Sequence, residues 1–217
     1  METWFAAHQS QITYTRFYAG DFPPGIESYD WLVVMGGPMG VYDDATLPWL
    51  ASEKAAIVAA VEAKKIVLGF CLGAQLLALV MGGKVTRNPN KEIGWHLIQK
   101  TEAADSIWIG RILPKLLLTF HWHGDTFALP PEAIPLATSE GCMQQGFVIG
   151  NRVVGLQFHP EATPSSIQAL LGACAEDLTE GPFVQPKQAL AGKREDFLAN
   201  GQFLEKLLSG LEACAGD

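Results

Sequence analysis

The chain has 217 residues, of which 48% are hydrophobic and 18% charged, and a formal net charge of -8. This length suits one sizeable domain and is too short for two ordinary domains joined by a linker. The acidic balance and scattered basic residues argue against nucleic-acid binding, and no apolar run reaches the roughly 18 residues of a membrane helix.

Taken along the chain, the hydrophobic patterns predict strands that alternate with helices. Apolar or alternating runs typical of buried strands occupy residues 12–18, 31–35, 66–70 and 153–158. Helical patterns occupy residues 2–9, 47–64, 72–81, 163–177 and 196–211. Strand, helix, strand, helix implies parallel crossovers, so we expect an α/β fold with a doubly wound, mostly parallel, flavodoxin-like sheet and helices on both faces.

Two segments depart from that pattern. Residues 95–100, 116–122 and 143–149 are short strand-like pieces without crossover helices, which predicts a small antiparallel layer. The chain also opens with helix where a first, central strand is expected, so a strand is missing at the N-terminus. We expect one domain over residues 1–217, with a core at about 10–178 and a C-terminal helical tail at 182–217.

The segment with the clearest chemical character is Gly-Phe-Cys-Leu-Gly-Ala-Gln at residues 69–75, between an apolar strand and an apolar helix. Gly69 and Gly73 flank Cys71 and permit the sharp turn that keeps a nucleophile exposed, and the helix N-terminus that follows offers its amides to an oxyanion. A cysteine in an apolar context is more often a buried small hydrophobe. The flanking glycines favour a nucleophile here.

A base for this thiol is expected in Gln-Phe-His-Pro-Glu at residues 157–161. His159 and Glu161 point the same way if the segment is extended, and a sharp turn at Pro160 would instead let the carboxylate reach the far nitrogen of the imidazole. Either arrangement supplies the base and the orienting group that nucleophilic acyl transfer requires. The alternative is a lone histidine at a strand end.

His121 and His123 belong to Phe-His-Trp-His-Gly-Asp at residues 120–125, and on a strand both would face one side together with Asp125. That pattern could bind a metal, but no further histidine or cysteine nearby completes a ligand set. We therefore predict no metal site and expect His123 and Asp125 to contact substrate, with Asp125 placed to meet an ammonium group.

A glycine-rich turn, Met-Gly-Gly-Pro-Met-Gly, follows the predicted strand at residues 31–35. It could bring the Gly37 amide beside the Leu72 amide to form a two-donor oxyanion hole, although an ordinary glycine-rich loop is the alternative. Neither the dinucleotide fingerprint nor the P-loop motif occurs, and no cofactor is expected.

The remaining three cysteines have no comparable setting. They are widely spaced without a Cys-x-x-Cys pair, so neither a zinc knuckle nor a disulfide framework is predicted, and we expect a reducing, cytoplasmic compartment. They are Cys142, Cys174 and Cys214.

Together these segments resemble the class I, or triad-type, glutamine amidotransferase family, and in particular its stand-alone, GMP synthase-like members. The matching pieces also include Glu92-Ile93-Gly94-Trp95, and they follow the family's order over about residues 30–165. The resemblance implies hydrolysis of the glutamine side-chain amide through a γ-glutamyl thioester. Cys71 would be the nucleophile, His159 would move the proton and Glu161 would orient His159.

The resemblance also implies oxyanion donors at Gly37 and Leu72 and a substrate-pocket role for Gln75. No synthetase segment is recognisable, so a separate ammonia-accepting synthetase chain is the expected partner. The alternatives are a γ-glutamyl peptidase with the same triad and a non-catalytic regulatory or binding subunit on the same fold. The missing first strand is the main departure from the family.

Overall fold

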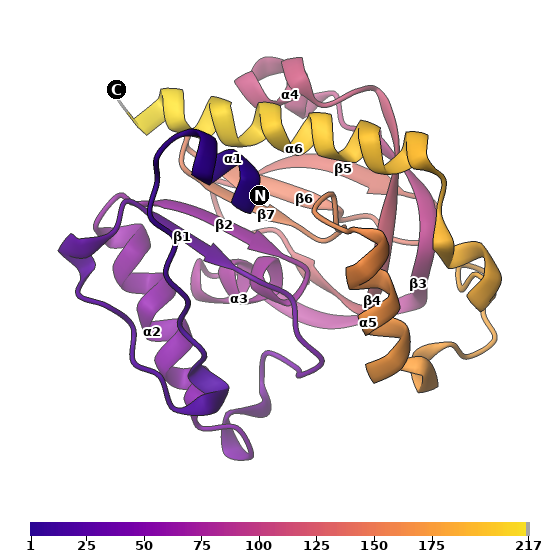
Figure 1. Ribbon diagram of the computed structural model, residues 1–217, viewed down its shortest axis with the longest axis horizontal. Coiled ribbons are helices and arrows are strands. Elements are labelled where there is room, and N and C mark those ends of the chain that lie inside the picture. The colour runs from indigo at the N-terminus through magenta and orange to yellow at the C-terminus, as the bar shows by residue number, and fades with distance from the viewer. Residues whose placement is uncertain (216–217) are drawn as a thin grey trace.

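The computed structural model describes residues 1–215, and its centre is one seven-stranded mixed sheet in the order β1-β2-β7-β6-β5-β3-β4 (Figure 1). The strands are β1 (Trp31–Val34), β2 (Ile66–Phe70), β3 (Lys84–Lys100), β4 (Leu116–Ala128), β5 (Ile134–Ser139), β6 (Gly146–Ile149) and β7 (Val153–Leu156). The helices are α1 (Glu2–Ala7), α2 (Trp49–Glu62), α3 (Leu72–Val80), α4 (Trp108–Ile112), α5 (Pro164–Ala173) and α6 (Arg194–Ala215).

The parallel part of the sheet holds β1, β2 and β7. Strand β1 pairs with β2 and β2 pairs with β7, both in parallel, and α2 makes the crossover between the first two. Helix α3 is nearly all apolar because most of it is buried against this sheet. The expected α/β architecture is therefore confirmed, and the carboxyl end of β2 carries the turn to α3.

The antiparallel part of the sheet is larger than expected from the sequence, which predicted a mostly parallel sheet. It also continues the same sheet, whereas a separate small antiparallel layer was expected. Strands β7, β6, β5, β3 and β4 pair in antiparallel fashion in that order. The long hairpin of β3 and β4 has a register shift between Arg87 and Glu92, which bends the sheet at that point.

Helices cover the two faces unequally. On one face α1, α4 and α6 pack over the antiparallel strands and β2, and Figure 1 shows α6 running across the top of the sheet beside α1. On the other face α2 and α3 pack against β1 and β2. Helix α6 is part of the main core instead of a tail outside it, because five of its side chains are buried there: Phe203, Leu204, Leu207, Leu208 and Leu211.

Residues 12–18 are not a strand, and that prediction was wrong. The segment lies outside the sheet, its residues are exposed or half-buried, and its only regular element is the 3-10 turn Phe17–Ala19. Alternating aromatic and polar residues form a strand only where one side of the alternation has a core to face. This segment has none.

The region before β1 is helical or irregular among residues 1–215. No strand precedes β1, which forms the edge of the sheet. Helix α1 packs against β1 instead, with the Phe5 and Trp31 rings 5.3 Å apart and perpendicular. Trp4 Nε1 also donates to Ser209 Oγ at 3.1 Å, which ties α1 to α6. Within the same residues, none of the helices combines the length and apolar character that a membrane-spanning helix requires.

Candidate active site

Cys71 sits at a strained turn between β2 and α3. It is the N-cap of α3, and its φ of 50° with ψ of -107° is a conformation that residues with a Cβ rarely adopt. Its amide donates to the Leu156 carbonyl at 2.8 Å, which fixes the turn to β7. This is the sharp strand-to-helix turn that the flanking glycines predicted, and the residue keeps 8% of its surface exposed.

Both flanking glycines are needed for close packing. A Cβ on Gly69 would lie 2.6 Å from the Gly73 carbonyl carbon, and a Cβ on Gly73 would overlap the Val34 carbonyl oxygen. The first turn of α3 therefore lies directly against β1 and β2. A side chain at either position would push the helix, and Cys71 with it, away from the sheet.

His159 and Glu161 lie in the segment that follows β7. The His159 amide donates to the Phe120 carbonyl on β4 at 2.8 Å, which anchors the backbone of this segment. His159 Nδ1 and Glu161 Oε1 are 2.7 Å apart, and both side chains are nearly buried. A carboxylate only accepts, so Nδ1 is the donor and Nε2 is the nitrogen left to act as base. Of the arrangements left open by the sequence, the structure shows the one in which the carboxylate reaches the imidazole nitrogen.

The electrostatics of the pair favour a protonated imidazole. Burial by itself lowers the pKa of His159, but the Glu161 carboxylate and the Cys71 sulfur outweigh it and raise that pKa well above its usual value. Such a ring can hold a proton at one stage of a reaction and release it at another.

The glycine-rich turn brings Cys71 and His159 to one place. A Cβ built on Gly36 would lie 3.5 Å from Cys71 Cβ and 3.4 Å from His159 Cε1, so both side chains lie against this glycine. Cys71 Sγ also lies 3.6 Å from the Trp122 carbonyl of β4. Residues from β2, β4, the turn after β1 and the segment after β7 thus converge.

Gly37 and Leu72 are neighbours at this point. A Cβ on Gly37 would lie 3.1 Å from Leu72 Cδ2, and Leu72 is the first residue of α3. The amide of a first helical residue has no carbonyl one turn earlier to bond, so that N–H stays available to an anion. The arrangement is compatible with the oxyanion role expected for both residues, which stays a prediction.

Gln75 and Asp125 are joined by a hydrogen bond one helical turn after Cys71. Gln75 Nε2 donates to Gln157 Oε1 at 3.1 Å and to the Asp125 carbonyl at 3.3 Å, so one buried amide links α3, β4 and the segment after β7. The Asp125 carboxylate instead forms an ion pair with Arg87 at 3.3 Å near the surface. Gln157 had no role predicted from the sequence, although it is the first residue of the segment that carries His159.

The imidazoles of His121 and His123 face Glu92, a residue that no sequence pattern connects with them, whereas the Asp125 carboxylate pairs with Arg87. Glu92 stands directly opposite His123 in the β3–β4 register, and its Oε2 lies 3.1 Å from His123 Nε2 and 3.9 Å from His121 Nδ1. All three residues are buried. Burial by itself raises the pKa of Glu92, but the two imidazoles and Ser139 bring it down to about 2. The expected contact of His123 with substrate stays a prediction.

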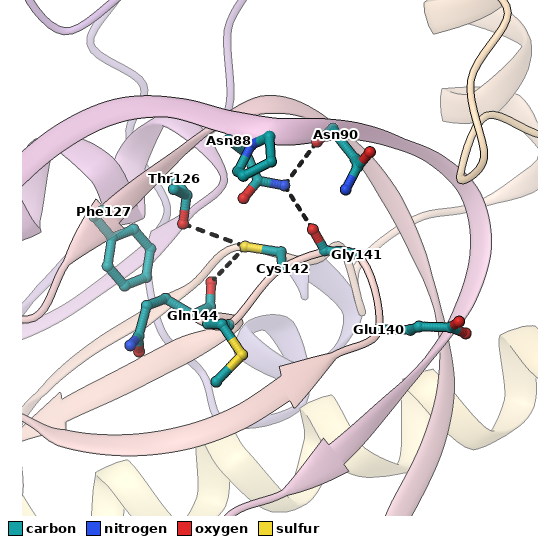
Figure 2. Close-up of a pocket in the computed structure, with 10 residues that line it drawn as sticks. Asn88, Asn90, Thr126, Phe127, Glu140, Gly141, Cys142 and Gln144 are labelled. Atoms are coloured by element: carbon teal, nitrogen blue, oxygen red, sulfur yellow. Dashed lines mark hydrogen bonds between the residues drawn. The ribbon is translucent and has the colours of Figure 1, made fainter.

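A separate cavity of about 390 Å³ opens beside the β3 bulge, between Asn88, Thr126 and the loop before β6 (Figure 2). Cys142 Sγ in its wall is 3.2 Å from Thr126 Oγ1 and 3.5 Å from the Gln144 carbonyl. None of the three predicted catalytic residues lines this cavity, so it is distinct from the cluster around Cys71.

Comparison with known proteins identifies proteins that resemble this chain in sequence and in structure. The sequence profile of the glutamine amidotransferase class I family matches residues 9–174. The chain is 35% identical over 181 residues to the putative glutamine amidotransferase-like protein YfeJ of Salmonella typhimurium, covering 82% of this chain and 76% of that protein. It is 33% identical over 138 residues to one subunit of the glutamine-hydrolysing GMP synthase of Sulfurisphaera tokodaii, covering 63% and 69% of the two chains.

A plant protein and a solved structure are also similar. Gamma-glutamyl peptidase 3 of Arabidopsis thaliana is 30% identical over 164 residues, covering 72% of this chain and 65% of that protein. A crystal structure of a glutamine amidotransferase from Thermotoga maritima superimposes with a TM-score of 0.85 at 34% identity, covering 97% of this chain and 90% of that chain.

Proposed function

The chain belongs to the class I glutamine amidotransferase family, and we propose that its site hydrolyses the side-chain amide of L-glutamine to glutamate and ammonia. One observation carries the proposal. The 2.7 Å contact between His159 Nδ1 and Glu161 Oε1 leaves His159 Nε2 as the nitrogen that can exchange a proton with the strained Cys71 in the same cluster. A nucleophile, a base and an orienting carboxylate in that relation are the parts of a triad.

In the proposed reaction the thiol proton passes to His159 Nε2, as the raised pKa of that ring favours, before Cys71 Sγ bonds to the amide carbon. The proton then passes from the imidazolium to the amide nitrogen, the C–N bond breaks and ammonia leaves a γ-glutamyl thioester. Water adds to the thioester carbon as His159 removes its proton. The C–S bond then breaks, glutamate is released and the thiol is restored.

Developing negative charge on the carbonyl oxygen needs donors that are already in place. The Gly37 and Leu72 amides are our proposed donors, because the two residues are in contact beside Cys71 and Leu72 begins α3. Gln75, His123 and Asp125 are the proposed substrate-binding residues. The Gln75 side chain donates to the Asp125 carbonyl one helical turn after Cys71, and His123 would act through its backbone because its ring faces Glu92.

We further propose that the ammonia is accepted by a separate synthetase chain. The similarity to the GMP synthase of Sulfurisphaera tokodaii supports a partner of this kind, since the similar chain is named as one subunit of that synthase. A reducing compartment such as the cytoplasm is proposed because the reaction requires Cys71 to remain a thiol.

The test is simultaneous measurement of glutamate and ammonia released from L-glutamine, with Cys71→Ala as the inactive control. We expect equal release of both products by the wild type and none by the variant. Glutamate without an equal amount of ammonia, or equal turnover by the variant, contradicts the proposed reaction.

A γ-glutamyl peptidase is the second candidate, and the similarity to gamma-glutamyl peptidase 3 favours it. The same triad would cleave a γ-glutamyl amide bond and release an amine in place of ammonia. γ-Glutamyl-p-nitroanilide separates the two functions, because a peptidase releases the coloured amine faster than it releases ammonia from glutamine. A protein that turns over neither substrate, and whose Cys71 resists alkylation, would instead have a regulatory or binding role.

A further inference from the structure

Glu92, His121 and His123 form a closed cluster of metal-ligand groups in the β3–β4 hairpin. One ligand atom from each lies within 4.8 Å of the other two, and all three residues are buried. We propose that this cluster, which we call the hairpin cluster, binds a divalent transition-metal ion of the zinc type. The triad does not use these residues.

The distances suit such an ion. Zinc bonds to histidine nitrogen and carboxylate oxygen are about 2.0–2.2 Å long, so neighbouring ligand atoms in a tetrahedral site lie about 3.3–3.6 Å apart. The separations from Glu92 Oε2, 3.1 Å to His123 Nε2 and 3.9 Å to His121 Nδ1, lie on either side of that range. Two imidazoles and one carboxylate are a ligand set that zinc accepts, with a fourth position for water.

The hydrogen bonds of His123 leave a conflict that a cation would remove. Its Nδ1 is 3.0 Å from the Asp125 carbonyl, and a carbonyl only accepts, so Nδ1 carries the hydrogen. In a neutral ring Nε2 then carries a lone pair and no hydrogen, and it faces the Glu92 carboxylate without a hydrogen-bond partner. Two acceptors in contact repel, whereas both can bind one cation.

His121 distinguishes a metal from a proton at this place. An additional proton on His123 would let Nε2 donate to Glu92, but it would leave both ring nitrogens of His121 without a hydrogen-bond partner among the described residues. Both of these nitrogens are buried, and a buried nitrogen left in that state destabilises the fold. A metal ion engages Glu92, His121 and His123 together.

Hydrogen bonds from neighbouring residues fix the side chains of Glu92 and His123, as outer-shell hydrogen bonds do in metal sites. Ser139 Oγ donates to Glu92 Oε1 at 2.6 Å, and Gln145 Nε2 donates to Glu92 Oε2 at 2.6 Å. The Asp125 carbonyl fixes the tautomer of His123. Carboxylate ligands that accept further hydrogen bonds, and histidines whose second nitrogen bonds a carbonyl, are the usual outer shell of a bound metal.

The cluster stands apart from the cavity of Figure 2 but close to it. A Cβ on Gly141, which lines that cavity, would lie 2.8 Å from Glu92 Oε1. Gly141, which has no side chain, therefore lies between the cavity and the Glu92 carboxylate. The ion would brace β3 against β4 at the point where the Phe120 and Trp122 carbonyls contact His159 and Cys71.

The experiment uses Cys71→Ala protein, because Cys71, His159 and Glu161 could themselves capture zinc. Protein is produced with zinc chloride in the medium, exchanged into chelator-free buffer and analysed for metal. About one equivalent of zinc per chain is expected, with a melting temperature above that of chelator-treated protein. Absence of bound zinc from this protein overturns the proposal.

Variants locate the ion. Glu92→Gln and His121→Gln should each lose most of the bound zinc, while His96→Ala should keep it. His96 is the matched control because its ring lies 5.7 Å from that of His121 but offers no ligand to the cluster. Equal zinc content in all three proteins overturns the assignment of these ligands.

Cobalt provides a readout that does not depend on how well the variants fold. Co²⁺ bound to the Cys71→Ala protein should give the visible bands of a tetrahedral site with nitrogen and oxygen ligands. A sulfur-to-cobalt charge-transfer band would mean that a cysteine binds the ion, which contradicts the hairpin cluster.

Discussion

His159 donates from Nδ1 to Glu161 Oε1 across 2.7 Å, and this contact determines which ring nitrogen is free to act as base. Glu161→Gln keeps the shape of the side chain but removes the charge. We expect kcat to fall by roughly 10- to 1,000-fold, because the wrong tautomer becomes accessible and the imidazolium loses its stabilising partner. Steady-state glutaminase kinetics test this, with the surface variant Glu62→Gln as control. A variant with wild-type kcat would remove Glu161 from the mechanism.

Cys71→Ala should abolish turnover, because no other atom at that position can form the thioester. The change removes one sulfur atom, so the far-ultraviolet circular dichroism and the cooperativity of unfolding should match those of the wild type. Cys174→Ala is the matched control, since this half-buried cysteine lies just after α5, and it should keep full activity. Activity in the first variant or its loss in the second contradicts the assignment of the nucleophile.

The sequence predicted those parts of the structure that rest on local patterns. β2 and α3 follow from an apolar run, a Gly-x-Cys-x-Gly turn and a second apolar run, and the contact between His159 and Glu161 follows from their spacing of two residues. Strand β5 was missed because Pro135 interrupts its pattern, and it forms because β3 and β6 pair with it on either side.

The hairpin cluster was missed for a different reason. His121, His123 and Asp125 alternate along one strand, and the sequence predicts no metal site formed by these three because no further histidine or cysteine nearby completes the ligand set. The structure pairs β3 with β4 so that Glu92 takes the third place, while Asp125 is drawn to Arg87. Register between distant strands is set by the turn and the bulge between them, and neither is visible in a spacing of histidines.

The raised pKa of His159 predicts how stability changes with pH. The folded-state pKa lies above the ordinary value of 6.5, so the stabilisation is complete below about pH 6.5 and is lost as pH rises through the folded pKa. The difference in unfolding free energy between wild type and His159→Gln should therefore shrink with rising pH. Urea unfolding at a series of pH values measures it. A difference that is flat, or that grows with pH, contradicts the predicted shift.

Gly73→Ala should destabilise the protein, because its new Cβ would overlap the Val34 carbonyl and push α3 from the sheet. We expect a loss of about 1–3 kcal/mol in unfolding free energy and a larger proportional loss of activity, since Cys71 moves with the helix. Gly201→Ala in α6 is the contrasting control. Nothing lies within 4 Å of its new Cβ, so it should stabilise by about 0.5–1 kcal/mol. Urea unfolding curves separate the two, and equal effects would mean that the close approach at Gly73 is absent.

The strained backbone of Cys71 predicts an unusual order of stability among inactive variants. With φ at 50° and ψ at -107°, a residue with a Cβ carries a cost of about 1–3 kcal/mol that glycine avoids. Glycine also gains more freedom in the unfolded chain, which offsets about 0.5–1 kcal/mol of that relief. Cys71→Gly should therefore be more stable than Cys71→Ala by about 1 kcal/mol, although glycine usually ranks below alanine at the start of a buried helix. Both variants lack the thiol, so a difference in their urea midpoints reports the backbone alone. If Cys71→Ala were the more stable protein, the turn would not be strained.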